Sequence, residues 1–238
     1  MIKPKELRRK TLYLAIETQN GHIASALSII EILIAVYGHM GPDDKFILSK
    51  GHGCLSWYAL LQSLGFNPTL SGHPDIDTAN GIHCTTGSLG HGLPIGVGMA
   101  WAKKIKGDPG MVYVLMGDGE CQEGTTWESV LLARHHKLDN LIIIVDYNYL
   151  QALDKTNQIL RLGDLAMFFE TMGIYTSEVD GHNIHDIQFA LGNVIREPKS
   201  IIAETIKGRG VSFMENDPKW HSRLPNALEL KQAYRDLE

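Results

Sequence analysis

Two short apolar runs, Met111–Gly119 (MVYVLMGDG) and Leu141–Asn148 (LIIIVDYN), decide the expected fold of this chain. Each run is rich in apolar and β-branched residues and ends in turn-forming residues, a pattern typical of a buried strand. The segment between them, residues 125–137 (TTWESVLLARHHK), has the length of a helix. A strand, a helix and a second strand form one βαβ unit, whose two parallel strands end at the same edge of a sheet.

Polar side chains follow both strands at the point where each strand ends. Asp118 lies between Gly117 and Gly119 after the first strand, and Asn148 follows the second. Because ligands of open α/β sheets bind at the carboxyl edge, we expect the Asp118 carboxylate and the Asn148 amide oxygen to converge. Two such hard oxygens suit Mg²⁺ or Ca²⁺, which also take phosphate oxygens and backbone carbonyls as ligands. The two glycines let the backbone approach a diphosphate closely.

A simpler interpretation of Asp118 remains open at this point. An aspartate that follows a strand often caps a helix or forms a turn. A lone Gly-Asp-Gly sequence favours that interpretation, whereas its pairing with Asn148 in a second strand-end turn favours the metal site.

The composition restricts the class of protein. A chain of 238 residues with 44% apolar residues is expected to form one domain, residues 1–238. A net charge of −5 and a pI near 6.1 argue against a nucleic-acid partner. The apolar segments are shorter than the roughly 18 residues that span a membrane, and the N-terminus has no apolar signal region. Three cysteines without metal-site spacing indicate free thiols, so a cytoplasmic protein without a membrane partner is expected.

Strands and helices alternate along the rest of the chain. We expect further strands at residues 46–48, 175–179 and 200–206, and helices at residues 7–18, 25–37, 54–64, 92–104, 162–172 and 187–195. The small residues Gly96, Gly98 and Ala100 are expected to let the helix at 92–104 pack closely on the sheet. This alternation predicts an α/β fold with a doubly wound, mostly parallel sheet flanked by helices.

A second glycine-rich loop, residues 85–92 (TTGSLGHG), runs into the helix at 92–104. Free backbone N–H groups at such a helix start suit an anion. The loop lacks the spacing of the phosphate-loop lysine motif and of the dinucleotide fingerprint. The loop indicates an anion site only because a metal–diphosphate site is expected opposite it.

Histidines are numerous, and five of them lie beside glycine in loops: His22, His52, His73, His91 and His182. Loops at the carboxyl edge of a sheet converge on the ligand, so several of these imidazoles are expected to face one cleft. Imidazole suits proton transfer near neutral pH. For each histidine, a solvated loop position is the alternative.

Residues 117–124 (GDGECQEG), followed by Asn148, resemble the thiamine diphosphate motif of the transketolases. Other stretches similar to that family follow the same order along nearly the whole chain: residues 20–22, 49–52, 71–74, 86–92, 179–182 and 204–210, with His221 beyond. The likeness covers only the N-terminal, diphosphate-binding half of the family, as in transketolases split between two genes. The resemblance therefore implies the thiamine-diphosphate-binding fold.

The resemblance also implies roles for individual residues. The side chains of Asp118 and Asn148 and the carbonyl of Leu150 correspond to the metal ligands. The positions expected to contact thiamine diphosphate are His52, Gly87, Leu89, Gly117, Gly119, Glu123 and Asn148. The residues expected to line the substrate channel and to move protons are His22, His73 and His221. Glu123 corresponds to a carboxylate at the partner interface, linked to the glutamate that activates the cofactor.

By this resemblance, the chain is expected to be the N-terminal subunit of a split enzyme that transfers a two-carbon ketol unit from a ketose to an aldehyde. It would use thiamine diphosphate with Mg²⁺ or Ca²⁺, and would act only with a C-terminal, pyrimidine-binding subunit, in an expected heterotetramer. Departures from the family pattern are Ile23 after His22, His91 in place of glutamine, Tyr149 after Asn148, and a shortened segment at residues 64–71.

Three alternatives stay open at this stage. The first is a specialised acyloin-type ketol transfer in a biosynthetic pathway, which the shortened segment allows. The second is the α subunit of a 2-oxo acid dehydrogenase, which shares the metal motif but not this set of histidines. The third is a binding module without catalytic activity.

Overall fold

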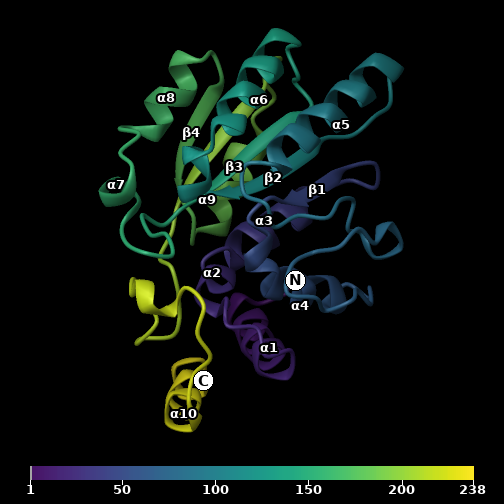
Figure 1. The fold of residues 1–238 in the computed structure, drawn as a ribbon. Helices are drawn as coiled ribbons and strands as arrows, with labels where there is room; N and C mark the ends of the chain where they lie inside the picture. Colours follow the sequence, from purple (N-terminus) through teal and green to yellow (C-terminus); the bar gives the residue numbers. More distant parts are fainter. Residues whose placement is uncertain (1) are drawn as a thin grey trace.

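A five-stranded parallel sheet forms the centre of the computed structural model, which describes residues 2–238 (Figure 1). The strand order is β1-β2-β3-β5-β4, and every neighbouring pair is parallel. The strands are β1 (Lys45–Leu48), β2 (Val112–Gly117), β3 (Leu141–Tyr147), β4 (Tyr175–Asp180) and β5 (Lys199–Glu204). Gly117 pairs with Asp146, so β2 and β3 end side by side. The two strands expected from the opening runs are thus confirmed as neighbours.

Helices cover both faces of the sheet (Figure 1). Alternate side chains of β2 point to opposite faces, so Tyr113 and Leu115 join one apolar core while Val114 and Met116 join the other. The first core includes α1 (Pro4–Glu17), α2 (Ile23–Leu27), α3 (Ile30–His39), α4 (Cys54–Ser63), α9 (Ile184–Gly192) and α10 (Ala227–Asp236). The second includes α5 (Gly92–Lys106), α6 (Gly124–His135) and α8 (Leu165–Thr171). The expected doubly wound parallel sheet is confirmed.

The structure corrects the expected helix at residues 25–37, which is broken between α2 and α3. In an unbroken helix the Ser25 carbonyl would accept from the N–H of Ile29. Here it accepts from Lys50 Nζ at 3.0 Å. A long-range contact from the end of β1 therefore takes the bond that would continue the helix.

Two smaller corrections concern the start of one helix and the presence of another. α9 starts three residues earlier than expected, because Asn183 caps it by accepting from the N–H groups of His185 and Asp186. The short helix α7 (Thr156–Ile159) was not expected.

The small residues of α5 differ in their surroundings. A Cβ atom added to Gly96 would collide with Val114 of β2, and Ala100 is fully buried. A Cβ atom on Gly98 would meet nothing within 4 Å. Close packing of α5 on the sheet is therefore confirmed for Gly96 and Ala100 and is wrong for Gly98.

The length and apolarity of a helix decide whether it can cross a membrane. Within residues 2–238, every helix is too short or too polar to cross a bilayer.

Candidate functional site

Asp118 and Asn148 lie together at the carboxyl edge of the sheet, each directly after its strand. The backbone N–H of Asp118 donates to the carbonyl of Asp146 at 3.2 Å, which joins the two strand ends. The Asn148 amide is oriented by two bonds: Nδ2 donates to Asp146 Oδ2 at 2.9 Å, and Oδ1 accepts from the N–H of Leu150 at 3.1 Å. Asp118, Asn148 and Leu150 line one cavity of about 200 Å³. The structure thus brings the three expected metal-ligating residues to one place.

The charge of Asp118 is poorly compensated in this cavity. Only 5% of the residue is exposed, and burial, together with the neighbouring Asp146 carboxylate, raises the pKa of Asp118 to about 7. Its Oδ1 accepts from the N–H of Gly119 at 2.9 Å. A buried carboxylate in this state is stabilised by a bound cation, so the residues present fit a divalent metal ion.

The donor set indicates which metals fit. Within residues 2–238, no group of three or more His, Cys, Asp or Glu side chains is placed to hold a metal ion. A metal at Asp118 would instead use one carboxylate, one amide oxygen, one backbone carbonyl and oxygens of its ligand. Oxygen ligands of this kind suit Mg²⁺ or Ca²⁺ rather than zinc.

A buried ion pair, which the sequence did not reveal, lies next to Asn148, one of the expected metal-ligating residues. Lys50 Nζ lies 2.5 Å from Asp146 Oδ2, and both side chains are almost fully buried. Ser28 Oγ donates to the same carboxylate at 2.8 Å, and Thr205 Oγ1 donates to its other oxygen. Burial alone would raise the pKa of Asp146, but the Lys50 ammonium and these hydrogen bonds hold it below its ordinary value. The available signal was a charged residue inside the apolar run 141–147.

Glu120 is a second residue that the sequence reasoning missed. Its buried carboxylate accepts from the N–H of Gly90 at 2.8 Å and of Gly117 at 3.2 Å, and also from Ser49 Oγ. It therefore joins the two glycine-rich loops to each other and to the end of β1. Gly90 has a φ of +78°, and a Cβ atom there would lie 2.6 Å from Glu123 Cβ, so the junction requires glycine.

The expected cofactor-binding residues fall into two groups: most line the cavity that contains Asp118, and Gly87 does not. Leu89, Gly117, Gly119, Glu123 and His52 line the cavity that contains Asp118. Gly87 instead packs against His73, whose Cδ2 would lie 2.9 Å from a Cβ atom on that glycine. Leu89 is 36% exposed and Glu123 is exposed as well. The cavity is thus bordered by side chains that remain accessible from outside this chain.

Four histidine rings gather beside the cavity. The ring centroid of His22 lies 5.6 Å from those of His52 and His221 and 6.0 Å from that of His73. His52 and His221 also line the cavity itself. The expectation that several imidazoles share one site is confirmed for these residues.

The buried rings of this cluster are held in the neutral form. Burial and the charge of Lys207 lower the pKa of His221 to about 4, and burial and the charge of Lys50 lower the pKa of His52 well below its ordinary value. Burial and the neighbouring His73 also lower the pKa of His22. Neutral imidazoles can accept protons and hydrogen bonds near pH 7.

Hydrogen bonds also orient two of these rings. His22 Nδ1 lies 3.1 Å from Asn20 Oδ1, an acceptor, so Nδ1 carries the proton and Nε2 is an acceptor. His221 Nδ1 accepts from Lys207 Nζ at 3.0 Å. Lys207 also donates to the Leu150 carbonyl at 3.2 Å, and burial lowers the pKa of Lys207 to about 8.

The other two glycine-flanked histidines lie elsewhere. His182 Nδ1 lies 3.0 Å from Glu31 Oε2, while its Nε2 accepts from the N–H of Ile206 at 2.8 Å. Arg8 binds the same glutamate through both of its terminal nitrogens, so His182 belongs to a buried structural network. His91 is exposed, and its ring contacts its own loop at the Leu89 carbonyl. These two histidines are thus not among those that share the site, and for His91 the exposed loop position is confirmed.

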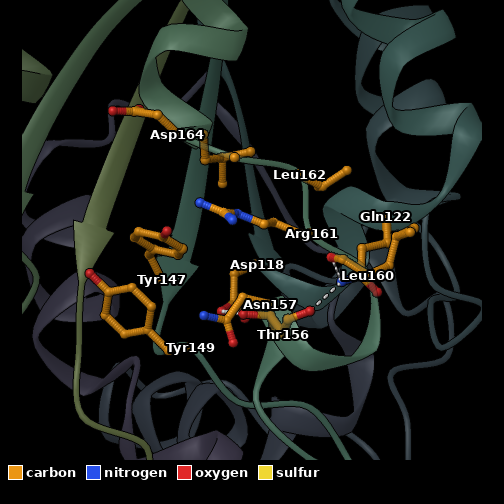
Figure 2. Close-up of a pocket in the computed structure, with 12 residues that line it drawn as sticks. Asp118, Gln122, Tyr147, Tyr149, Thr156, Asn157, Leu160, Arg161, Leu162 and Asp164 are labelled. Carbon is orange, nitrogen blue, oxygen red and sulfur yellow. Dashed lines mark hydrogen bonds between the residues drawn. The ribbon is translucent and has the colours of Figure 1, made fainter.

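A second cavity adjoins Asp118 on its other side (Figure 2). It has a volume of about 230 Å³ and is lined by Tyr147, Tyr149, Gln122 and Arg161, among others. Figure 2 shows Asp118 among the side chains that line this cavity, and the Gln122 side chain directed to Thr156 and Leu160. No sequence pattern indicated this cavity.

Comparison with known proteins agrees with this geometry. Residues 14–237 match the family model described as "Transketolase, thiamine diphosphate binding domain". The chain is 38% identical to a subunit of the apulose-4-phosphate transketolase of Actinobacillus succinogenes, with 99% of this chain and 95% of that protein covered. It is 35% identical to the 6-deoxy-6-sulfo-D-fructose transketolase subunit SqwG of a Clostridium species, with 92% and 88% covered.

Longer, single-chain transketolases are similar over part of their length. Human transketolase is 32% identical, with 98% of this chain but 41% of the human protein covered. Among solved structures, transketolase from Campylobacter jejuni superposes with a TM-score of 0.86 at 28% identity, over 97% of this chain and 41% of that one. Transketolase from Leishmania mexicana gives a TM-score of 0.89 at 25% identity, over 100% and 41%. The chain belongs to the transketolase family and carries its thiamine-diphosphate-binding domain.

Proposed function

We propose that this chain is the diphosphate-binding subunit of a split transketolase, which transfers a two-carbon ketol unit from a ketose to an aldehyde. The observation that carries the proposal is the convergence of Asp118, Asn148 and the Leu150 carbonyl on a cavity shared with His52 and His221. The relatives named as transketolase subunits, which this chain covers almost from end to end, support the same function.

The proposed cofactor is thiamine diphosphate with Mg²⁺ or Ca²⁺. Asp118, Asn148 and Leu150 would hold the metal, and the metal together with His52 and the backbone at Gly119 would hold the diphosphate. When bound, thiamine diphosphate supplies the carbon nucleophile for ketol transfer, while the protein supplies orientation and proton transfer. The raised pKa of Asp118 supports this arrangement, because a cation would stabilise its ionised form.

The histidine cluster is proposed to act on the substrate. The rings of His73 and His221 lie beside that of His22, His221 lines the cavity, and the Nε2 atom of His22 is an acceptor. Neutral rings of this kind can bind sugar hydroxyls and take up a proton from them. Gly87, packed on His73, would set the position of that ring.

A partner subunit is part of the proposal. Single-chain transketolases are more than twice as long as this chain, which covers 41% of the human protein. Because relatives that this chain covers almost from end to end are named as transketolase subunits, the proposed partner is a pyrimidine-binding subunit, with two copies of each in a heterotetramer. The exposed Glu123 beside the cavity suits a position at that interface. The relatives act on different ketoses by name, so the proposed substrates are a ketose donor and an aldehyde acceptor without further assignment.

The test combines binding with activity. Titration calorimetry of the chain with thiamine diphosphate should show binding in the presence of Mg²⁺ and its loss in excess chelator. Ketol transfer should then appear when the neighbouring gene product of the pyrimidine-binding type is added to this chain. Thiamine diphosphate binding that is unchanged in excess chelator would contradict the metal site. Oxidative decarboxylation of a 2-oxo acid by this chain together with its partner would favour the dehydrogenase alternative.

A further inference from the structure

Residues 150–160, called the strap below, follow Asn148 and lie beside Asp118 (Figure 2). The strap is closed on itself by backbone bonds. Leu150 and Lys155 form an antiparallel bridge, and the N–H of Thr156 donates to the Tyr149 carbonyl at 2.9 Å. These bonds connect the two ends of the strap, and the Leu150 carbonyl is part of the connected segment.

Both polar atoms of the Gln122 side-chain amide form hydrogen bonds to the strap. Its Nε2 donates to the carbonyl of Leu160 at 2.7 Å and to that of Thr156 at 3.0 Å. Its Oε1 accepts from Gln151 Nε2 at 2.7 Å. Gln122 ends the short 3₁₀ helix η3 (Gly119–Gln122), which starts directly after Asp118. One side chain thus ties both ends of the strap to the element that carries the proposed metal-binding carboxylate.

Packing alone holds most of the strap weakly. Leu150 is buried, but Leu153 is 84% exposed and Leu160 is 53% exposed, so residues 151–160 bury little apolar surface. Segments with few buried apolar contacts open at low free-energy cost unless hydrogen bonds hold them. Other side chains also hold the strap: Asn148 Oδ1 accepts from the N–H of Leu150 at 3.1 Å, Thr156 Oγ1 donates to Asp118 Oδ2 at 3.4 Å, and Lys207 Nζ donates to the carbonyls of Leu150 and Gln151.

We propose that Gln122 is a positioning residue for the metal site: by clasping the strap against η3, it fixes the Leu150 carbonyl opposite Asp118. This inference rests on the proposed function, because Leu150 and Asp118 are the metal ligands only in that function. Gln122 does so with neutral hydrogen bonds to strap backbone on one side and to Gln151 on the other. Metal affinity, rather than the chemistry of the reaction, is the property that it controls.

The test is the Gln122→Ala variant of the full chain, with Gln122→Glu as a chemical control and Gln158→Ala as a positional one. Glutamate keeps the size of the side chain but replaces two N–H donors by an oxygen that faces carbonyls. Both Gln122 variants should raise the Mg²⁺ concentration needed for half-maximal thiamine diphosphate binding about ten-fold, because each loses bonds of ordinary strength. Gln158 lies exposed on the same strap, and its variant should bind as the wild type does.

A second measurement needs neither metal nor cofactor. Lys155 lies in the strap and Arg161 directly follows it, and both are trypsin sites. Without ligand, cleavage after these two residues should be several-fold faster in the Gln122 variants than in the wild type or in Gln158→Ala. Circular dichroism should be the same for all four proteins.

The outcomes distinguish a failure of the proposed role of Gln122 from a failure of the proposed function. If the wild type binds in a metal-dependent way and the Gln122 variants need no more Mg²⁺, the role of Gln122 is refuted and the proposed function stands. If the wild type shows no metal-dependent binding, the metal assignment and the inference built on it both fail. Equal trypsin cleavage in all variants would also refute the clasp.

Discussion

Lys50 Nζ and Asp146 Oδ2 lie 2.5 Å apart in the interior, directly beneath the Asn148 amide that the same carboxylate holds. The pair joins the end of β1 to β3 and also supplies the bond that breaks the helix at Ser25. A buried ion pair costs desolvation free energy, so its partners depend strongly on each other. Its position indicates a role in holding Asn148 and in leaving Asp118 as the carboxylate that needs a cation.

The Lys50→Met variant should be strongly destabilised. It leaves Asp146 buried without its ammonium partner, a change that costs about 3–5 kcal/mol in other proteins. Urea unfolding followed by circular dichroism measures the loss. Lys106→Met, at an exposed position on α5, is the control and should change stability by less than about 0.5 kcal/mol.

The pH dependence of this pair has a definite sign. The pKa of Asp146 is lower in the folded protein than in the unfolded chain, so its contribution is present above the unfolded pKa and is lost as the pH falls through the folded one. The difference in stability between wild type and Lys50→Met should therefore shrink in strong acid. A difference that is constant from neutral to strongly acidic pH would contradict the pairing.

Asp118→Asn should abolish metal-dependent cofactor binding without destabilising the chain. The folded pKa of Asp118 is raised to about 7 from its ordinary value of 3.8, so its contribution to stability is fully present below 3.8 and is lost as the pH rises to about 7. At pH 8 the uncharged variant should thus be at least as stable as the metal-free wild type. Calorimetry measures the loss of metal-dependent cofactor binding, and thermal unfolding without metal measures the stability of the variant.

The same shift predicts how metal binding by the wild type depends on pH. Protons compete with the cation for Asp118, so Mg²⁺ affinity should rise as the pH is raised through about 7. Asp154→Asn, an exposed change on the strap, should leave this profile intact. Unchanged cofactor affinity in Asp118→Asn would remove Asp118 from the metal site.

Substitution of His22, His73 or His221 by alanine should lower kcat/KM of the reconstituted enzyme and leave cofactor affinity nearly unchanged. A loss of about 10²–10³ corresponds to about 3–4 kcal/mol of transition-state stabilisation. His91→Ala is the matched control, because that ring is exposed and contacts only its own loop. Normal turnover in all three variants would place the substrate channel elsewhere.

Gly96 and Gly98 form a matched pair on one helix. Gly96→Ala should destabilise by about 1–3 kcal/mol, because its methyl group would overlap Val114. Gly98→Ala should stabilise by about 0.5–1 kcal/mol, because the position is open and alanine favours a helix. Thermal unfolding of both variants checks the opposite signs; equal effects would contradict the packing of α5 on β2.

The sequence predicted those parts of the site that depend on strand ends. Asp118 and Asn148 could be placed together because their strands are parallel neighbours, and the apolar runs before them are unambiguous. The sharing of one site by His22, His52 and His73 followed from the convergence of loops at the same edge.

Contacts between distant side chains left no such pattern. Lys50 and Asp146 lie in separate motifs, and their pairing also decides the break between α2 and α3. The bonds of Gln122 go mainly to backbone carbonyls, which carry no residue identity, so the clasp on the strap was invisible in the sequence. Propensity and periodicity report local structure, and these features are set by tertiary contacts.

The last prediction concerns assembly: the chain alone should bind the metal and the diphosphate but should show no ketol transfer. The proposed metal ligands lie in this chain, whereas the cavity beside Leu89 and Glu123 is bordered by exposed side chains that a second subunit would cover. An obligate interface of this kind typically buries about 2,000 Å² or more.

The purified chain should therefore be assayed with thiamine diphosphate, Mg²⁺ and a panel of ketoses and aldehydes, with and without the pyrimidine-binding subunit, while its mass is followed by light scattering. Glu123→Ala should weaken the response to added partner, and Glu128→Ala, an exposed carboxylate one turn along α6, should not. Sustained turnover by the chain alone would refute the split-enzyme proposal, because no partner would then be needed to complete the site.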